Sequence, residues 1–266
     1  MRKIWGLLIV VLLILVSFGS ASAHEAMVGP TGVLKFDKEK SYGGYTLFAP
    51  ITNCKTTYLI DMEGNVVYKW ESEYTPGMYA MLLPNGNLLR GGVLKKPPAS
   101  IGGVSGIVQE IDWDGKVVWE YTMNSPTEIH HHCFTRMPNG NTLILGWEAK
   151  SIDEAIAKGR DPRTIPVSVH GMGKYHNEFW VDFVREVDKK GKTVWEWHVW
   201  DHVGTGPHQF DINYILPKKL GAIYTSFDWT HFNTVEYIPE LDMVLLNSRN
   251  FSEFYLIDHK TGNMVY

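Results

Sequence analysis

A hairpin motif that recurs four times constrains the fold of this chain more than any other feature. Each copy has a strand, an aspartate, a tight turn containing glycine, and a second strand that carries an aromatic residue. Glycine suits such turns because it tolerates positive φ. The copies cover 58–70, 108–119, 184–195 and 255–266. This repetition predicts an architecture built from one supersecondary unit.

A second type of hairpin alternates with the first. Its copies cover 81–89, 136–144 and 237–245, and the first two contain Pro-Asn-Gly-Asn, a strong hairpin signal. The third copy keeps its proline, Pro239, without the Asn-Gly pair. One hairpin of each type makes a four-stranded unit.

We therefore predict an all-β chain, a β-propeller of four-stranded blades, in which the 10 Trp, 13 Tyr and 11 Phe pack between sheets. Longer intervals between repeats indicate insertions at 150–172 and 204–224, the first with a short helix over 152–158. About three and a half blades are present, whereas closed propellers typically have about four to eight. We expect an incomplete ring that is truncated at its C-terminus. An open sandwich or barrel is the alternative.

Residues 1–23 have the layout of a cleavable signal peptide, with Arg2 and Lys3, an apolar run over 7–16, and Ala-Ser-Ala at 21–23. A transmembrane anchor is the alternative, but the apolar run is short for a span. We expect a propeller domain over 24–266 that is periplasmic or secreted and has no membrane partner after cleavage.

The net charge of −4 becomes more negative once Arg2 and Lys3 are removed, which predicts no nucleic-acid partner. An anionic substrate would need individual positive side chains. In an oxidising compartment Cys54 and Cys133 could form one disulfide or remain two free thiols.

Two histidine-bearing segments occupy equivalent places in successive units. His130 and His231 each precede the proline of a second-type hairpin by eight residues, so Asn233 corresponds to His132. These strands would be the inner ones, whose side chains can converge on a central channel. Alternation along a strand predicts that His130 and His132 share a face opposite His131. The alternatives are a zinc site, a surface histidine run and, for His231, a structural role.

Arg249 follows the strand 243–247 of the same unit. Its planar guanidinium suits an oxyanion such as sulfate or phosphate. A surface salt bridge is the alternative.

The stretches 43–48, 57–65, 131–141, 228–233 and 248–249 resemble bacterial aryl-sulfate sulfotransferases. The resemblance implies an exported six-bladed propeller that moves a sulfuryl group from a phenolic sulfate ester to an acceptor phenol. The transfer would pass through a sulfohistidine, without a nucleotide donor, cofactor or metal. Homo-oligomerisation stays open.

The same resemblance implies roles for individual residues. His231 and Arg249 are 18 residues apart and fall where the family has an assisting histidine and its arginine. The other assisting histidine matches the pair His131 and His132, of which the repeat register also favours His132. Asn233, the equivalent of His132, is expected to bind substrate.

The chain departs from the family pattern in two places. Cys133 follows the paired histidines where an acidic residue is common, which would weaken the orientation of the neighbouring imidazole. The nucleophilic histidine is expected well beyond Arg249, after residue 266, and His259 in a hairpin turn is a poor candidate.

These residue types suit sulfuryl transfer, which spreads charge over equatorial oxygens that Arg249 would hold. His132 or His231 would assist the departing phenol as an acid, and a nucleophilic histidine would give ping-pong kinetics. Two other functions stay open. One is a non-catalytic exported propeller that binds a ligand or protein, and the other is a quinone-dependent dehydrogenase propeller suggested by the sequence at 258–262.

Overall fold

The computed structural model describes residues 32–52, 54–99, 101–164, 178–214 and 228–266. The predicted signal peptide and parts of both predicted insertions therefore lie outside the described residues. Residues 44–266 belong to one structural unit, and this unit contains every copy of the repeat. In the described ranges, no helix is both long enough and apolar enough to cross a bilayer.

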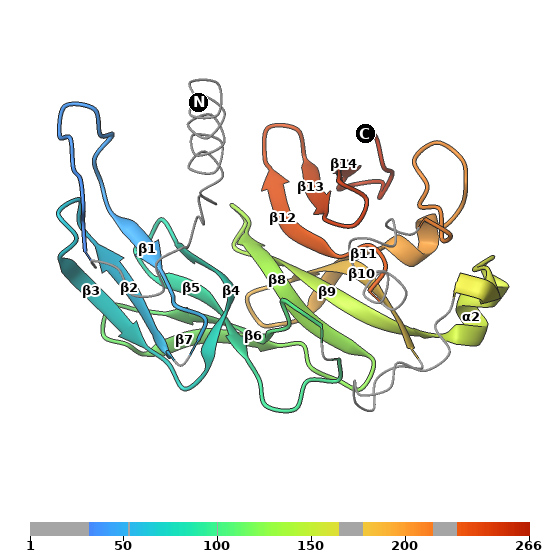
Figure 1. Ribbon diagram of the computed structural model, residues 1–266, viewed down its shortest axis with the longest axis horizontal. Helices are drawn as coiled ribbons and strands as arrows, with labels where there is room; N and C mark the ends of the chain where they lie inside the picture. The colour runs from blue at the N-terminus through green and yellow to red at the C-terminus, as the bar shows by residue number, and fades with distance from the viewer. Residues whose placement is uncertain (1–31, 53, 100, 165–177, 215–227) are drawn as a thin grey trace, which may run out of the picture. The chain divides into compact units, whose positions relative to one another are not determined.

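The strands form four antiparallel sheets in which each strand pairs with its neighbour in the sequence (Figure 1). We call these sheets blades 1 to 4. Blade 1 contains β1 (Thr46–Phe48), β2 (Thr56–Ile60) and β3 (Val66–Glu71). Blade 2 contains β4 (Thr75–Leu82), β5 (Leu88–Val93), β6 (Gly106–Ile111) and β7 (Val117–Thr122). Blade 3 contains β8 (Glu128–Arg136), β9 (Thr142–Ser151), β10 (Glu178–Val187) and β11 (Thr193–His198). Blade 4 contains β12 (Phe232–Ile238), β13 (Met243–Ser248) and β14 (Glu253–Asp258).

This order confirms the prediction of an all-β propeller built from alternating hairpins. The Pro-Asn-Gly hairpins join β4 to β5 and β8 to β9, and the aspartate hairpins join the last two strands of blades 1, 2 and 3. The short predicted helix is also present as α2 (Ile152–Ala157), which Ser151 and Glu154 begin with a reciprocal capping box.

The repeated aspartate has a local structural role at the turn. The backbone N–H of Asn65 donates to Asp61 Oδ1 at 2.8 Å, and that of Lys116 donates to Asp112 Oδ1 at 2.8 Å. The third copy has the same bond, from Lys192 to Asp188. An aspartate side chain that binds the backbone across a turn favours the hairpin before any tertiary contact forms.

The hydrophobic core lies between successive blades rather than within one sheet. One cluster joins Leu59 and Trp70 of blade 1 to Leu88 and Ile111 of blade 2. Two further clusters join blade 2 to blade 3 and blade 3 to blade 4. Face-to-face packing of consecutive sheets is the arrangement expected of propeller blades.

Tryptophans at the ends of the aspartate hairpins add directional contacts between blades. Trp70 Nε1 donates to the carbonyl of Asp112 at 3.1 Å, in the corresponding turn of the next blade. Trp197 Nε1 donates in the same way to Gly262 at 3.0 Å. The buried indole thus satisfies its N–H and fixes the relation of two blades.

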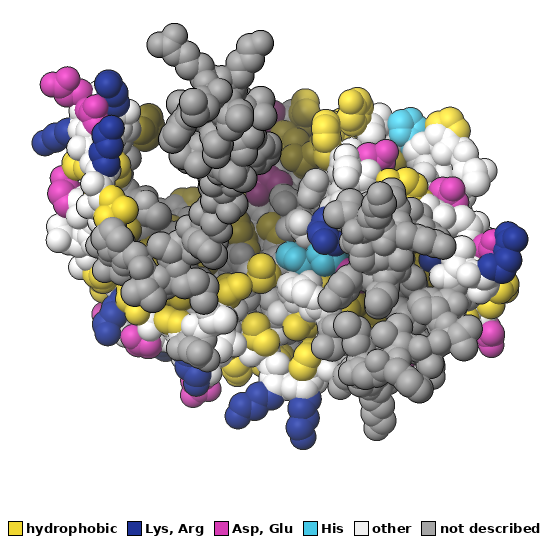
Figure 2. Space-filling view, in the orientation of Figure 1, with side chains coloured by type: hydrophobic (Ala, Val, Ile, Leu, Met, Phe, Trp, Pro, Cys, Tyr) yellow, Lys and Arg dark blue, Asp and Glu magenta, His cyan; other side chains and the backbone are white. Residues whose placement is uncertain are grey.

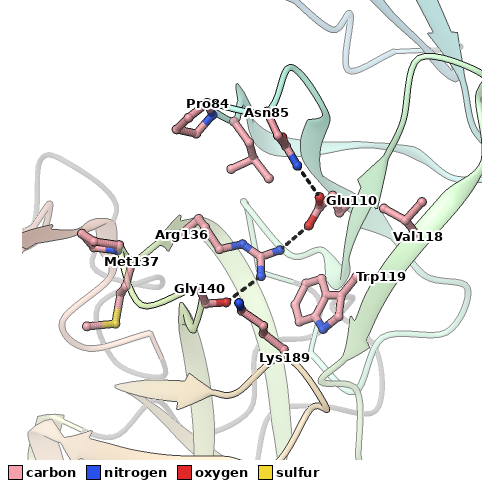
Figure 3. Close-up of a pocket in the computed structure, with 11 residues that line it drawn as sticks. Pro84, Asn85, Glu110, Val118, Trp119, Arg136, Met137, Gly140 and Lys189 are labelled. Carbon is pink, nitrogen blue, oxygen red and sulfur yellow. Dashed lines mark hydrogen bonds and ion pairs between the residues drawn. The ribbon is translucent and has the colours of Figure 1, made fainter.

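A pocket of about 700 Å³ lies between blades 2 and 3 (Figure 3). Arg136 occupies its centre, paired with Glu110 at 2.8 Å and stacked over the ring of Trp119 at 4.7 Å. Arg136 also donates to the carbonyl of Gly140 at 2.9 Å. These contacts use the guanidinium to join the two blades.

The first strand of blades 2, 3 and 4 carries a bulge at a matching height. The pairing register shifts between Pro76 and Ala80 in β4, and between His130 and Phe134 in β8. In β12 it shifts between Phe232 and Thr234. β8 packs beside both β4 and β12, so the three bulges are neighbours. Bulges release residues from the ladder and redirect their side chains.

Candidate functional site

The residues of the three bulges line a common pocket of about 320 Å³. Blades 2, 3 and 4 each contribute a pair of adjacent residues, and Glu236 completes the lining. The pairs are Met78 and Tyr79, His132 and Cys133, and Asn233 and Thr234. Histidine and basic side chains reach the surface next to each other in the space-filling view (Figure 2). The pocket therefore brings together His132 and Asn233, which the repeat register had related.

The bulge in β8 changes how the three consecutive histidines face. His132 has a φ of 47°, and its Nδ1 lies 2.9 Å from Nδ1 of His131. His130 instead contacts the ring of Phe134, and its Nδ1 donates to the carbonyl of Leu145 at 2.9 Å. The prediction that His130 and His132 share a face opposite His131 is therefore wrong, because it assumed an unbroken pleat.

His132 and His231 come together from blades 3 and 4. Their ring centroids are 4.9 Å apart, at an interplanar angle of 70°. Behind them His131 stacks on Trp147 at 3.6 Å and 8°, and the centroid of Trp147 lies 5.7 Å from that of His231. His231 also has a positive φ, 46°. Two imidazoles held in left-handed backbone conformations indicate a site where the fold tolerates local strain.

Two buried aspartates contact these histidines. Asp228 Oδ2 is hydrogen-bonded to His231 Nδ1. Asp182 Oδ1, from β10, lies 3.0 Å from His131 Nε2, off the line of a straight hydrogen bond. Asp182 also accepts from the hydroxyl of Thr230 and from the backbone N–H of Phe232, the latter at 3.0 Å.

Burial sets the charge states of the site. It lowers the pKa of His132 to about 2, helped by neighbouring histidines and Arg249, and it lowers that of His131 well below its usual value. Burial also raises the pKa of Asp182 and of Asp228 to about 6, against hydrogen bonds that lower them. Near neutral pH the site thus combines neutral imidazoles at 131 and 132 with two buried carboxylates.

Arg249 is the basic side chain of this region. Its backbone N–H donates to the carbonyl of His231 at 3.0 Å, and its Nη1 donates to Asn250 Oδ1 at 3.0 Å. The residue is exposed, and its charge contributes to the lowered pKa of His132. Arg249 therefore lies beside both histidines, and within the described ranges its exposed guanidinium makes one hydrogen bond, to Asn250.

Asn233 and Cys133 differ in what they offer to the pocket. Asn233 Oδ1 is buried without a hydrogen-bond partner among the described residues. The Cys133 thiol contacts the backbone carbonyls of Val235 and Phe134, and burial raises its pKa to about 11. Cys133 and Cys54 are both free, so of the two alternatives the structure has free thiols.

The sequence had assigned no role to Asp182 or Asp228. Asp228 begins the stretch 228–233, so its position in the motif was a signal, whereas Asp182 lies in an ordinary strand without one. Within the described ranges, no cluster of three or more His, Cys, Asp and Glu side chains has the arrangement of a metal site. His259 lies apart from the site and contacts Glu186 and Asp242.

Comparison with known proteins identifies the family. The family model for arylsulfotransferases (ASST) matches residues 33–266. The chain belongs to the arylsulfotransferase family. All site residues of this chain, from His131 to Arg249, lie within the match. No curated protein gives a significant match.

Two solved structures are similar to this chain at low identity. Kuenenia stuttgartiensis hydrazine synthase has 13% identity and a TM-score of 0.43, over 79% of this chain and 51% of that one. The Dos1 propeller has 9% identity and a TM-score of 0.31, over 83% of this chain and 66% of that one. The chain thus spans about half the length of the first structure.

Proposed function

We propose that this arylsulfotransferase moves a sulfuryl group from a phenolic sulfate ester to an acceptor phenol through a sulfohistidine. One observation carries the proposal. His132, His231 and Arg249 lie together beside a pocket to which Asn233 adds an amide whose Oδ1 has no partner among the described residues. Imidazoles, a guanidinium and an amide are groups that can hold a sulfate ester and move its protons without a cofactor.

Arg249 has the role of holding the transferred group. The sulfuryl group carries charge on three equatorial oxygens in the transition state, as a phosphoryl group does. A guanidinium donates two parallel N–H bonds to such oxygens, and Arg249 has an exposed side chain to do so. Asn233 is placed to add a hydrogen bond from the pocket wall.

The two histidines of the pair have different charge environments. Because the pKa of His132 is about 2, its imidazole stays neutral and can accept a hydrogen bond. His231 is bonded to Asp228, whose carboxylate can balance a proton on the imidazole. We therefore assign proton donation to the departing phenolate, whose own pKa is about 10, to His231 rather than to His132.

The covalent step has a simple balance. A histidine nitrogen lone pair forms an N–S bond while the S–O bond to the donor phenol breaks. The departing phenolate oxygen takes a proton from His231. The acceptor phenol then attacks sulfur, loses its proton, and releases the histidine. The proposal assigns none of the histidines described above to the role of this nucleophile.

The proposal includes export. The layout of residues 1–23 supports a signal peptide and hence a periplasmic or secreted protein, which would meet phenolic sulfates outside the cytoplasm. Its partners are then the small donor and acceptor phenols.

The test is to incubate the full-length protein with 4-nitrophenyl sulfate and phenol and to measure nitrophenolate and phenyl sulfate. We expect both products to form in parallel, and Arg249→Ala to lower the rate on the order of 10²- to 10³-fold, as loss of one transition-state donor does. Arg163→Ala is the matched control, because the exposed Arg163 pairs with Asp161. Absence of nitrophenolate release, with Arg249→Ala indistinguishable from wild type in every assay, would contradict the proposal.

A further inference from the structure

The buried carboxylates Asp182 and Asp228 lie behind the site, where protein groups hold the side chain of Asp182 and the backbone of Asp228. Both residues are almost fully buried. Asp182 is held by the hydroxyl of Thr230, just before β12, and by the backbone N–H of Phe232, the first residue of β12. The backbone carbonyl of Asp228 accepts from Asn250 Nδ2 at 2.8 Å. An ionised aspartate oxygen can only accept hydrogen bonds, so each carboxylate dictates where a neighbouring imidazole carries its proton.

The contacts of Asp182 determine a chain of proton positions. Because a carboxylate oxygen of Asp182 lies 3.0 Å from Nε2, the hydrogen of the neutral His131 is favoured on Nε2. Nδ1 of His131 is then an acceptor. Because Nδ1 of His132 lies 2.9 Å away, that atom must be the donor of the pair. The lone pair of His132 is then on Nε2.

The opposite assignment is electrostatically unfavourable. It would place the lone pair of His131 Nε2 against a carboxylate oxygen 3.0 Å away, in a part of the protein with little exposure. A nitrogen lone pair and a negatively charged carboxylate repel each other at that distance, and a low dielectric constant strengthens the repulsion. The preference depends on charge and distance, so it holds although the contact is not aligned as a straight hydrogen bond.

We infer that Asp182 and Asp228 are positioning residues that set the tautomers of the site imidazoles. Asp182 acts through His131, so that His132 carries its hydrogen on Nδ1 and presents Nε2 as an acceptor. Asp228 acts directly, so that His231 carries a hydrogen on Nδ1 and uses Nε2 for proton exchange. The use of these tautomers in sulfuryl transfer rests on the proposed function; the tautomers themselves are a property of the resting protein.

This inference accounts for the cysteine that follows the paired histidines. The Cys133 thiol contacts backbone carbonyls and orients neither imidazole. The carboxylates that do so reach the histidines from β10 and from the segment before β12. An acidic residue at position 133 is thus unnecessary for fixing His131 and His132 in this chain.

The first experiment measures the tautomers without any variant or substrate. Long-range proton–nitrogen NMR correlation of the ¹⁵N-histidine-labelled full chain, at about pH 8 where both carboxylates are ionised, distinguishes Nδ1–H from Nε2–H in each ring. We expect Nε2–H for His131 and Nδ1–H for His132 and His231. A hydrogen on Nε2 of His132 in the wild-type protein would overturn the inference.

A second experiment uses three variants. Asp182→Leu removes the acceptor and should turn His132 into a mixture of tautomers. Asp182→Asn keeps an amide oxygen facing His131 and Phe232 and should preserve the wild-type tautomers. Asp153→Asn, at an exposed site in α2, is the matched control. If Asp182→Leu folds and leaves every tautomer unchanged, Asp182 does not act as a positioning residue.

Kinetics with 4-nitrophenyl sulfate connect the tautomers to the reaction. We expect Asp182→Leu to lower kcat on the order of 10²-fold or more with little change in KM, since a wrong histidine tautomer costs about 10⁴-fold in a Ser-His-Asp triad. Asp182→Asn should recover most of the rate. Correct tautomers in a protein that transfers no sulfuryl group would refute the proposed function alone, and incorrect tautomers in an active protein would refute this inference alone.

Discussion

The imidazole of His132 lies on the backbone of Gly103, and the backbone N–H of His132 donates to the Gly103 carbonyl at 3.0 Å. Gly103 has a φ of +97°, and a Cβ added there would lie 1.8 Å from Cε1 of His132 and 2.2 Å from its Nε2. The position of the catalytic candidate therefore depends on a missing side chain in another loop.

Gly103→Ala should displace His132 and lower sulfotransfer at least 10-fold, because small misplacements of a reacting group are costly. The strained φ should also lower the free energy of unfolding by about 1–3 kcal/mol. Gly102→Ala is the control, since a Cβ there meets nothing within 4 Å. Initial rates and urea unfolding of both variants test this. Equal behaviour of the two variants would show that the contact with Gly103 does not position His132.

His132→Asn should separate catalysis from stability. The asparagine amide can replace Nδ1 as the donor to His131, but it has no equivalent of Nε2. We expect the rate to fall about 10²- to 10⁴-fold, the usual contribution of a positioned acid or base, with unfolding nearly unchanged. A variant that keeps its rate would remove His132 from the mechanism.

His130 should make the protein sensitive to acid without taking part in the reaction. Burial lowers its pKa from 6.5 to about 4, so its neutral form contributes stability that is complete above pH 6.5 and is lost as the pH falls towards 4. That loss is on the order of 3 kcal/mol. His130→Asn can still donate to the Leu145 carbonyl and should lose less stability than wild type over this range.

Urea unfolding between about pH 7 and pH 4 measures the difference between wild type and His130→Asn. His208→Asn is the control, because His208 is exposed and asparagine tolerates its φ of 59°. Parallel pH dependence in wild type and His130→Asn would contradict this account.

Trp197→Phe should weaken the contact between blades 3 and 4. It removes the hydrogen bond to the Gly262 carbonyl and leaves that acceptor with one partner fewer. This should lower the free energy of unfolding by about 1 kcal/mol, in addition to the effect of lost packing. Trp70→Phe should cost a similar amount between blades 1 and 2. Trp113→Phe replaces an indole that is 42% exposed, so it should lower the stability measured by thermal unfolding less than the other two changes do. If all three variants unfold alike, the indole hydrogen bonds do not contribute measurably.

The blades could be predicted from the sequence because their determinants are local. The aspartate and glycine of each hairpin act within one turn, as the bond from Asn65 to Asp61 shows, and the capping box of Ser151 and Glu154 at the start of α2 is equally local. Alternating hairpins then follow from their order along the chain.

The side of the strand on which each histidine side chain lies could not be predicted in the same way. Period-two alternation holds only for an unbroken pleat, and the bulge in β8 places His132 against His131 instead of with His130. Asp182 was missed because it reaches His131 from β10, with no motif around it. Contacts of this kind depend on which strands become neighbours, and that information is not local in sequence.

The three aligned bulges have a consequence for how such a site can change. Residues 78, 132 and 233 lie where the strand pairing is interrupted, so their side chains are not needed to hold the sheet together. Mutations there can alter the chemistry of the pocket while the inter-strand hydrogen bonds remain. Blades 2, 3 and 4 thus each offer one position at which substrate preference can evolve, or be engineered, with little loss of folding stability.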